Sequence, residues 1–394
     1  MRSLLIPALL AAPVVSQDIW FPEGEVRVEL PLHVNDYGDG GIELHVDVSV
    51  DGKPARFLFD TGAKMAIDEQ FAKEHELART TELLGVGVTQ VASMGSYRVR
   101  SLRLGSVELE NFIAGAIDSS DFDGDGLLGS EILAACVVEL DLVARRMILH
   151  DADRFEPPED AHRVELMKSI GSVDCRAKLG GIARQRCVID TGNATNVLLH
   201  WPFVRKHGLL ADSSRFEASE IVGVFGSSVV YGARLAALEL GDVIVTDVPV
   251  DLVDESAGGL TASGVLSANL GMRLLSAFRL WFDGRRHALW LASPTGRKRV
   301  PYRDTFGIVL DRDGVDVRVA YCLAGSPSEP LLEPNDVILE VAGEAAPGDL
   351  ASVASALRVH DQVDLVVRRG SEEREVSLER RHWLPLVAPA RSAR

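Results

Sequence analysis

Residues 56–62 read RFLFDTG, and residues 186–192 read RCVIDTG. In both stretches a short apolar strand runs into the triplet Asp-Thr-Gly, which puts Asp60 and Asp190 at equivalent places. Two carboxyl groups held face to face cannot both ionise cheaply, so they share one proton. The ionised group can take a proton from water while the protonated group donates to a substrate carbonyl. The two triplets therefore predict activation of water, provided that the fold brings them together.

A lone Asp-Thr-Gly triplet is equally typical of a strand followed by an Asx-type turn, so its surroundings matter. Strands precede both triplets, at residues 43–50 and 171–179. The features that follow keep one order: a short helix at 71–77 and 203–209, a Gly-rich strand at 84–87 and 222–226, a Leu-x-Leu-Gly segment at 102–105 and 238–241, and an apolar segment at 126–129 and 264–267. This repeat predicts two copies of one β lobe, at residues 25–151 and 163–293.

The order of strand, triplet, hairpin and then Leu127-Leu128-Gly129 before a helix resembles the retropepsin-like aspartic proteases. The resemblance covers residues 25–293 and implies a mainly β fold. Two acid-protease lobes related by pseudo-two-fold symmetry would form, in one chain, what retroviral proteases build from two subunits. It also implies that Asp60 and Asp190 meet between the lobes as a catalytic dyad and hold the lytic water. Hydrolysis then passes through a gem-diol, without a covalent intermediate.

The resemblance further implies roles for residues beside the dyad. Thr61 and Thr191 would each hydrogen-bond across the interface to the opposite turn and fix the carboxyl groups. Gly62 and Gly192 let a backbone N–H approach a carboxylate closely. Gly129 packs beneath the Asp60 turn, where a side chain would collide.

Two positions depart from the family pattern. Ser267 stands where the matched segment 264–267 would end in Gly. Asn193 stands where the family more often has Ala or Ser, as Ala63 does in the first copy. These departures leave open a protein that has the protease lobes but no turnover.

Two Gly-rich segments are candidates for mobile flaps over the dyad, because a lid needs a flexible backbone. The flap candidates are Gly85 and Gly87 in segment 85–90, and Gly223 and Gly226 in segment 223–228. An ordinary hairpin remains an equally open interpretation of both segments.

The composition changes after a linker at 294–299. The segments GSP at 325–327 and PNDVIL at 334–339 resemble a bacterial PDZ domain, and we place this α+β domain at residues 302–380. Such domains take a peptide as an added strand and capture its terminal carboxylate with backbone N–H groups. The residues implied for peptide binding are Phe306, Gly307 and Ile308. Residues 381–394 are expected to be a loose tail.

The N-terminus predicts export. A basic start at Met1-Arg2 and an apolar stretch at residues 3–15 are typical of a signal peptide, here residues 1–17, and indicate a periplasmic or extracellular protein. The apolar stretch is too short to span a bilayer, so we expect no stable membrane span after cleavage; an uncleaved N-terminal anchor is the open alternative. The net charge of −17 argues against nucleic acid as a partner.

Four cysteines occur, and two of them, Cys175 and Cys187, flank a turn at residues 180–181. An exported protein could join them in a disulfide, but small buried thiols are equally consistent with the sequence. Cysteine and histidine spacings typical of metal sites do not occur, so we expect no metal and no cofactor.

The sequence as a whole predicts an exported aspartic endopeptidase that hydrolyses peptide bonds with the dyad Asp60 and Asp190. Its PDZ domain would bind peptide C-termini or unfolded segments and so recruit a polypeptide substrate or partner. A monomer would suffice, because one chain carries both lobes. The alternative is a catalytically inactive, protease-like peptide-binding protein in which the PDZ domain is the working module.

Overall fold

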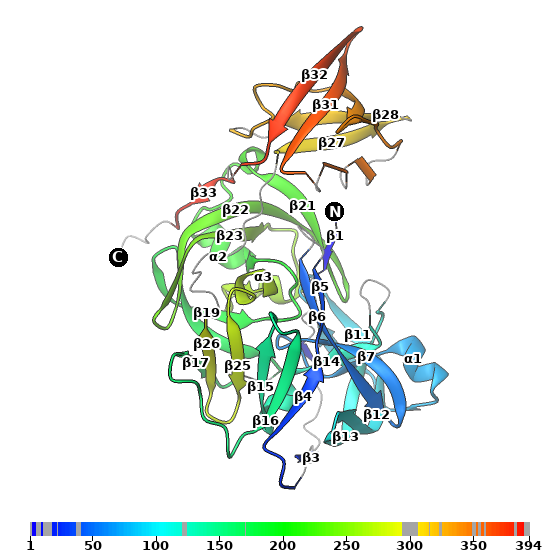
Figure 1. The fold of residues 1–394 in the computed structure, drawn as a ribbon, viewed down its shortest axis with the longest axis vertical. Helices are drawn as coiled ribbons and strands as arrows, with labels where there is room; N and C mark the ends of the chain where they lie inside the picture. Colours follow the sequence, from blue (N-terminus) through cyan, green and yellow to red (C-terminus); the bar gives the residue numbers. More distant parts are fainter. Residues whose placement is uncertain are drawn as a thin grey trace.

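The computed structural model describes residues 2–4, 9–10, 18–21, 23–36, 41–119, 124–169, 171–293, 306–314, 316–322, 325–348, 352–353, 356–357, 360–381 and 384–389. Within these residues the fold is mainly β (Figure 1). The expected cleavage site near Gln17 and the linker at 294–299 lie outside them. Within the same part of the chain, helices are too short or too polar to cross a membrane.

The first half of the body is built around a hairpin that leads into Asp60. Its first strands, β6 (Ile42–Val50) and β7 (Lys53–Phe59), pair in antiparallel register. After the Asp60 turn, β8 (Ala66–Asp68) leads into α1 (Glu69–Glu74), whose N-terminus is capped by the Asp68 side chain. The other strands of this half are β9 (Ala78–Arg79), β10 (Leu83–Val86), β11 (Val91–Met94), β12 (Ser96–Leu104), β13 (Val107–Ile117) and β14 (Gly126–Leu128).

The second half keeps this order, although fewer and longer strands follow its helix. The hairpin of β18 (Val173–Leu179) and β19 (Ile182–Ile189) leads into Asp190. After that turn come β20 (Val197–Leu199), α2 (Trp201–Lys206), β21 (Glu217–Gly223), β22 (Gly226–Leu240), β23 (Val243–Val253), β24 (Ala268–Leu270) and α3 (Met272–Leu275). The pairings agree as well: β14 runs parallel to β7 and antiparallel to β8, and β24 stands in the same relation to β19 and β20.

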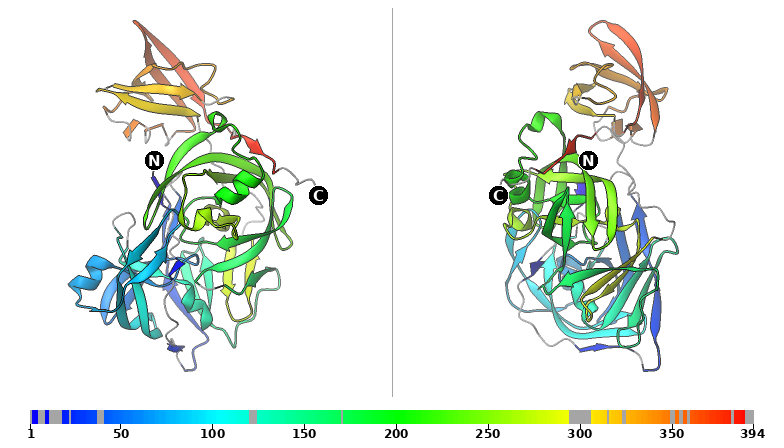
Figure 2. Two further views of the ribbon diagram at one scale, coloured as in Figure 1. Left: turned by 180° about the vertical axis from the view of Figure 1, so that it is seen from behind. Right: turned by 90° about the vertical axis from the view of Figure 1, so that its left-hand side faces the viewer.

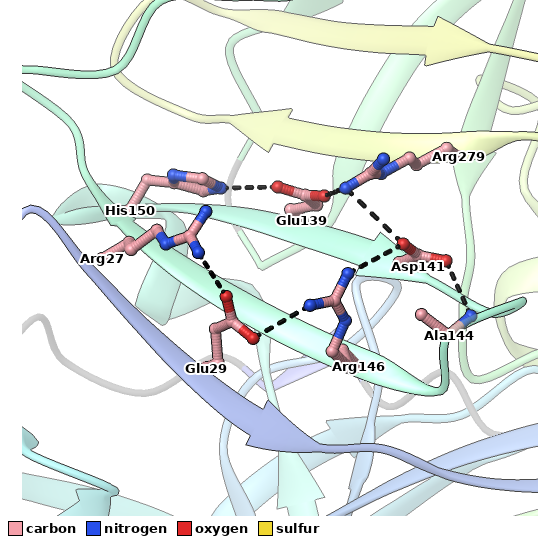
Figure 3. Close-up of polar contacts among 8 residues, drawn as sticks. All are labelled: Arg27, Glu29, Glu139, Asp141, Ala144, Arg146, His150 and Arg279. Atoms are coloured by element: carbon pink, nitrogen blue, oxygen red, sulfur yellow. Dashed lines mark hydrogen bonds and ion pairs between the residues drawn. The ribbon is translucent and has the colours of Figure 1, made fainter.

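One sheet joins the two halves. Its strand order is β17 (His162–Met167), β26 (Ala288–Ala292), β25 (Arg279–Asp283), β15 (Cys136–Asp141), β16 (Arg146–Asp151), β4 (Arg27–Pro31). The central pair, β15 with β25, is antiparallel and takes one strand from each half. Arg279 of β25 donates to the buried Glu139 of β15, which also bonds His150 of β16 (Figure 3). Charged hydrogen bonds thus cross the line between the halves.

Short strands complete the body. They are β1 (Arg2–Leu4), β2 (Leu9–Leu10), β3 (Asp18–Trp20) and β5 (His33–Asp36). Strands β3 and β5 extend the sheet of the first half, at β13 and β6. Strands β1 and β2 lie against β21 and β10, respectively. Single 3₁₀ turns occur at Ser130–Ala134, Ser213–Arg215 and Gly259–Ala262.

The C-terminal part forms a separate sheet at one end of the molecule (Figures 1 and 2). Its path is β27 (Ile308–Asp313), β28 (Asp316–Cys322), β29 (Val337–Val341), β31 (Gln362–Arg369), β32 (Glu372–Glu379), and the short β30 (Glu344–Ala345) pairs with β29. A core of its own, which includes Val319, Leu365 and Val367, holds this sheet together. Arg369 donates twice to the buried Asp336 and ties β31 to the loop before β29.

Part of the expected loose tail is ordered, and that expectation was wrong for residues 384–389. Strand β33 (Leu386–Val387) runs parallel to β22 of the second half. The Arg234 backbone N–H donates to the Pro385 carbonyl at 3.0 Å, and its guanidinium donates to the Leu384 carbonyl at 2.8 Å. Val387 is buried in the main core. The tail therefore satisfies backbone groups on β22 and covers apolar surface, two needs that its short sequence does not reveal.

Candidate active site

Each aspartate sits in a turn that directly follows a buried strand. The Asp60 N–H donates to the Leu128 carbonyl at 3.0 Å, and the Asp190 N–H donates to the Leu270 carbonyl at 3.0 Å. These carbonyls end β14 and β24, the parallel neighbours of the strands that carry the aspartates. Both turns are thus fixed in the same way from opposite halves.

The two threonines bind the turns to each other. The Thr61 N–H donates to Thr191 Oγ1 at 2.9 Å, and the Thr191 N–H donates to Thr61 Oγ1 at 3.2 Å. Each hydroxyl also donates to a backbone carbonyl of the opposite half, Thr61 to Ile189 at 2.6 Å and Thr191 to Phe59 at 2.7 Å. Both side chains are fully buried, so these four bonds hold the halves together at this point.

The Asp60 and Asp190 carboxyl groups lie together and are fully buried. A Cβ built on Gly62 would come within 2.7 Å of Asp190 Oδ1, so only glycine lets the two turns approach this closely. Asp60 Oδ1 accepts the Gly62 N–H at 2.8 Å, whereas Asp60 Oδ2 finds no donor among the described residues. Burial and then the charge of Asp190 raise the pKa of Asp60 well above its ordinary value, although the Gly62 and Gly192 amides lower it.

Asp190 has more donors around it. Its Oδ1 accepts the Asn193 N–H at 3.0 Å, and its Oδ2 accepts from Asn269 Nδ2 at 2.5 Å. The Asn269 side-chain oxygen in turn bonds His200 Nε2 at 2.8 Å. Burial raises the pKa of Asp190 to about 7, while the bonds from Asn269 and Asn193 act in the opposite direction. The two acids therefore differ in surroundings.

The match between segments 126–129 and 264–267 was wrong, and Ser267 is not the counterpart of Gly129. The strand that pairs with β19 is Ala268-Asn269-Leu270, and Gly271 follows it. A Cβ on Gly129 would lie 2.3 Å from the Lys64 carbonyl carbon, and one on Gly271 would lie 2.4 Å from the Asn196 carbonyl oxygen. Both halves thus keep glycine beneath the aspartate turn, while the Ser267 hydroxyl donates to Gln185.

Asn193 does not disturb the turn. Its backbone N–H serves Asp190, and its side-chain oxygen accepts from the Thr195 N–H and the Thr195 hydroxyl, both at 2.9 Å. The amide side chain therefore closes a local turn that Ala could not build.

Both Gly-rich segments form hairpins. Gly85 lies in β10 and Gly87 follows it, while Gly223 and Gly226 end and begin the strands β21 and β22. Each tip packs onto the opposite half. Val88 is buried in a cluster of the second half, and Phe225 packs against a cluster of the first half that contains Leu58 and Ala63.

Hydrogen bonds tie the first tip to the turn at Gly259–Ala262 of the second half. The Leu260 N–H donates to the Gly87 carbonyl at 2.9 Å, and the Thr261 N–H donates to the Val88 carbonyl at 3.1 Å. The Thr89 hydroxyl donates to the Gly226 carbonyl at 3.0 Å and so reaches the second tip. This segment, 258–261, was missed in the sequence, because nothing in it resembles a flap partner.

The candidate PDZ residues lie at the start of β27. Phe306 is buried in the C-terminal core, Gly307 has a φ of 71°, and Ile308 opens the strand. Strand β27 pairs only with β28 among the described strands, so its other side is a sheet edge.

Cys175 and Cys187 lie directly opposite each other on β18 and β19 as buried thiols. Groups of three or more residues able to hold a metal ion are absent from the described part of the chain.

Residues 46–132 match the family model of the aspartyl proteases. The matched stretch contains Asp60, Thr61, Gly62 and Gly129, and it ends before the second triplet. No curated protein matches the chain. The mainly β fold is compatible with an aspartic protease, and the match supports an aspartic protease and hence a hydrolase.

Proposed function

We propose that this protein is an exported aspartic endopeptidase with a catalytic dyad of Asp60 and Asp190, formed between lobes at residues 25–151 and 163–293. The observation that carries the proposal is the double exchange of hydrogen bonds between Thr61 and Thr191. It supports an arrangement in which two equivalent turns present their carboxyl groups to one place. The duplicated strand pairings point the same way.

In the proposed reaction, a water held by both carboxyl groups attacks the carbonyl carbon of a peptide bond. The ionised carboxylate takes a proton from the water, and the protonated carboxyl gives its proton to the carbonyl oxygen. The resulting gem-diol collapses, the C–N bond breaks, and the amine leaves with the proton that the carboxylate had taken. The second gem-diol hydroxyl returns a proton to the dyad.

An extended polypeptide is the proposed substrate. The outer strands of both hairpins already accept short added strands: β1 lies parallel to β21, and β2 lies antiparallel to β10. Backbone groups on these edges can therefore hold an extended chain whatever its side chains. Because the dyad is buried, the hairpin tips must separate before such a chain can enter.

We propose that residues 302–380 form a PDZ domain that recruits peptide C-termini or unfolded segments. The open edge of β27 and the positive φ of Gly307 beside it support this role. Binding of a hydrophobic C-terminal peptide, and its loss when the terminal carboxylate is amidated, tests the proposal by isothermal titration calorimetry. Equal affinity for both peptides would contradict it.

Digestion of an unfolded protein at pH 3 to 8, with and without pepstatin, tests the activity itself. We expect cleavage that pepstatin blocks and that Asp60→Asn or Asp190→Asn reduces by at least about 10³-fold. Asp242→Asn is the matched control, since this exposed acid lies in the β22–β23 turn. Full activity in both dyad variants would contradict the proposal.

The export proposal has its own measurement. Mass spectrometry of protein secreted by an exporting host should show an N-terminus at or near Gln17. A single-chain dyad also predicts that activity per chain does not depend on protein concentration. Peptide binding without cleavage would favour the inactive peptide-binding alternative. Ser267 no longer supports that alternative, because Gly271 is the counterpart of Gly129.

A further inference from the structure

The two halves differ at the position beside each aspartate. Leu127 in β14 and Asn269 in β24 are counterparts, because the residues after them, Leu128 and Leu270, receive the aspartate N–H in the same way. The Asn269 amide donates to Asp190 Oδ2 at 2.5 Å. Leu127 has no polar group to offer Asp60, and Asp60 Oδ2 finds no donor among the described residues.

His200 fixes the direction of the Asn269 amide. This imidazole is fully buried at the start of α2, and its Nε2 lies 2.8 Å from Asn269 Oδ1. Burial lowers the pKa of His200 to about 4, so the ring is neutral at mildly acidic pH. In the tautomer that carries its hydrogen on Nε2, the ring donates to the amide oxygen, and the amide NH₂ faces Asp190. An N–H donor stabilises a carboxylate more than a neutral acid.

We propose that Asn269, oriented by His200, is a positioning residue that makes Asp190 the ionised member of the dyad and Asp60 the proton-bearing member. Asp60 Oδ2 then carries the shared proton and donates to Asp190, which accounts for an oxygen that otherwise lacks a donor. In the reaction, whose occurrence rests on the proposed function, Asp190 takes the proton from water and Asp60 protonates the substrate carbonyl.

Among the residues that the structure describes, few other titratable groups surround the dyad. Asp60 is the one that faces Asp190, and His200 reaches it through Asn269. On the other side, beneath the Asp60 turn, Glu131 Oε2 accepts the Met65 N–H at 3.0 Å and lies near Lys64. Burial raises the pKa of Glu131 to about 7, so Glu131→Gln serves as the control for its titration.

Carboxyl ¹³C NMR on the full chain tests the proton assignment without any need for activity. In Asp60→Asn the remaining Asp190 keeps the Asn269 donor, whereas in Asp190→Asn the remaining Asp60 has only the Gly62 and Gly192 amides. We expect the Asp190 carboxyl to titrate at least about 1 pH unit below the Asp60 carboxyl, the shift for one hydrogen bond to a charged group. Equal values, or the reverse order, would overturn the inference.

The substitution Asn269→Leu copies the first half into the second. We expect the pKa read from the acidic limb of the kcat/KM profile to rise by about 1 pH unit, with a smaller change in KM. Leu127→Asn gives Asp60 a matching donor, and we expect it to lower the same limb. An unchanged limb in a folded Asn269→Leu protein refutes the role of Asn269; if that variant does not fold, the NMR comparison decides.

The two proposals fail separately. Protein that never cleaves peptides but shows the expected NMR order would refute the endopeptidase and keep the proton assignment. Active protein with equal titration of both acids would keep the endopeptidase and refute the assignment.

Discussion

At the scale of single residues, the threonine hydroxyls matter because each one makes two buried hydrogen bonds across the halves. Thr61 donates to Ile189 and accepts from Thr191, and no solvent can replace these bonds. Removing the hydroxyl leaves two buried polar groups unpaired, and that cost exceeds the small change in volume.

We therefore expect Thr61→Val to lower the free energy of unfolding by about 2–4 kcal/mol and to reduce activity. Thr61→Ser keeps the hydroxyl and is the matched control, with a cost below about 1.5 kcal/mol. Urea denaturation followed by fluorescence measures both. Similar losses for Val and Ser would show that packing of the methyl group, rather than the hydrogen bonds, stabilises the turns.

The two buried aspartates also predict how stability depends on pH. Burial raises the pKa of both acids, so the folded state binds more protons than the unfolded one between the ordinary aspartate value of 3.8 and the raised values. Such a group supports stability fully below 3.8, and this support is lost as pH rises through about 7.

Replacing Asp190 by Asn removes this ionisation. We expect Asp190→Asn to be more stable than the wild type at pH 8, by at least about 1 kcal/mol, and to lose that advantage at pH 4. Urea denaturation at the two pH values measures the difference. A constant difference between variant and wild type would show that the acids ionise freely in the fold.

The aspartates and threonines could be predicted from the sequence because the Asp-Thr-Gly triplet occurs twice in one chain. Asn269 and His200 were missed, since their roles arise from pairing between β24, β19 and β20 and leave no local pattern. The polar Asn269 also breaks the apolar-apolar-Gly pattern at residues 269–271. Segment 264–267, which is more apolar, therefore matched residues 126–129 better in sequence.

At the scale of elements, the hairpin tips are held by the opposite half rather than by their own. The turn at Gly259–Ala262 provides the N–H groups that bind the first tip, and Gly259 itself has a φ of 55°. A Cβ there would come within 2.3 Å of the Gly87 carbonyl oxygen. The mobility expected for flaps therefore depends on this contact as much as on the glycines in the hairpins.

Gly259→Ala should push the first tip away from the second half. We expect amide hydrogen exchange at Leu260 and Thr261 to speed up by at least about tenfold, because their acceptors on the tip would move away. Gly264→Ala is the control, since a Cβ there meets nothing within 4 Å. Unchanged exchange in Gly259→Ala would mean that the tip stays in place without this turn.

The joining sheet depends on a carboxylate that serves both halves. Burial favours the neutral form of Glu139, but hydrogen bonds from His150 and Arg279 outweigh it and lower its pKa. A lowered pKa contributes stability above the ordinary glutamate value of 4.5, and this contribution is lost as pH falls. The sequence repeat did not predict the pairing of β15 with β25, because the two strands lie far apart in the chain.

Glu139→Gln keeps the shape and removes the charge. We expect a loss of about 1–3 kcal/mol at pH 7 that stays constant down to pH 4.5 and shrinks as the pH falls further, measured by urea denaturation. Asp153→Asn, in an exposed pair with Arg285, should change stability by less than about 0.5 kcal/mol. A pH-independent loss in Glu139→Gln would contradict the role of the charge.

At the scale of the whole molecule, the chain returns from its C-terminal sheet to the body. Val387 of β33 is buried in the main core, whereas its neighbour Leu386 is largely exposed. The residues that resemble a PDZ domain predicted a strand-rich unit at the C-terminal end. The pairing of β33 with β22 was not predictable, because a two-residue apolar strand carries no sequence pattern that distinguishes it from a solvent-exposed tail.

This alternation gives a matched pair of substitutions. We expect Val387→Asp to release β33, to lower the free energy of unfolding by about 2 kcal/mol or more and to expose residues 384–389 to thermolysin, which cleaves before apolar residues. Leu386→Asp should leave both unchanged. Equal digestion of the two variants would show that the tail does not hold through Val387.

The C-terminal sheet is attached to the body at both of its ends. One attachment is the chain between residues 293 and 306, and the other is the pairing of β33 with β22. Cleavage of one peptide bond between residues 293 and 306 would remove the first attachment. The two fragments would stay associated through β33 and would dissociate only under denaturing conditions. If the C-terminal sheet binds a peptide as we propose, β33 keeps that peptide close to the body even after the chain between residues 293 and 306 is cut.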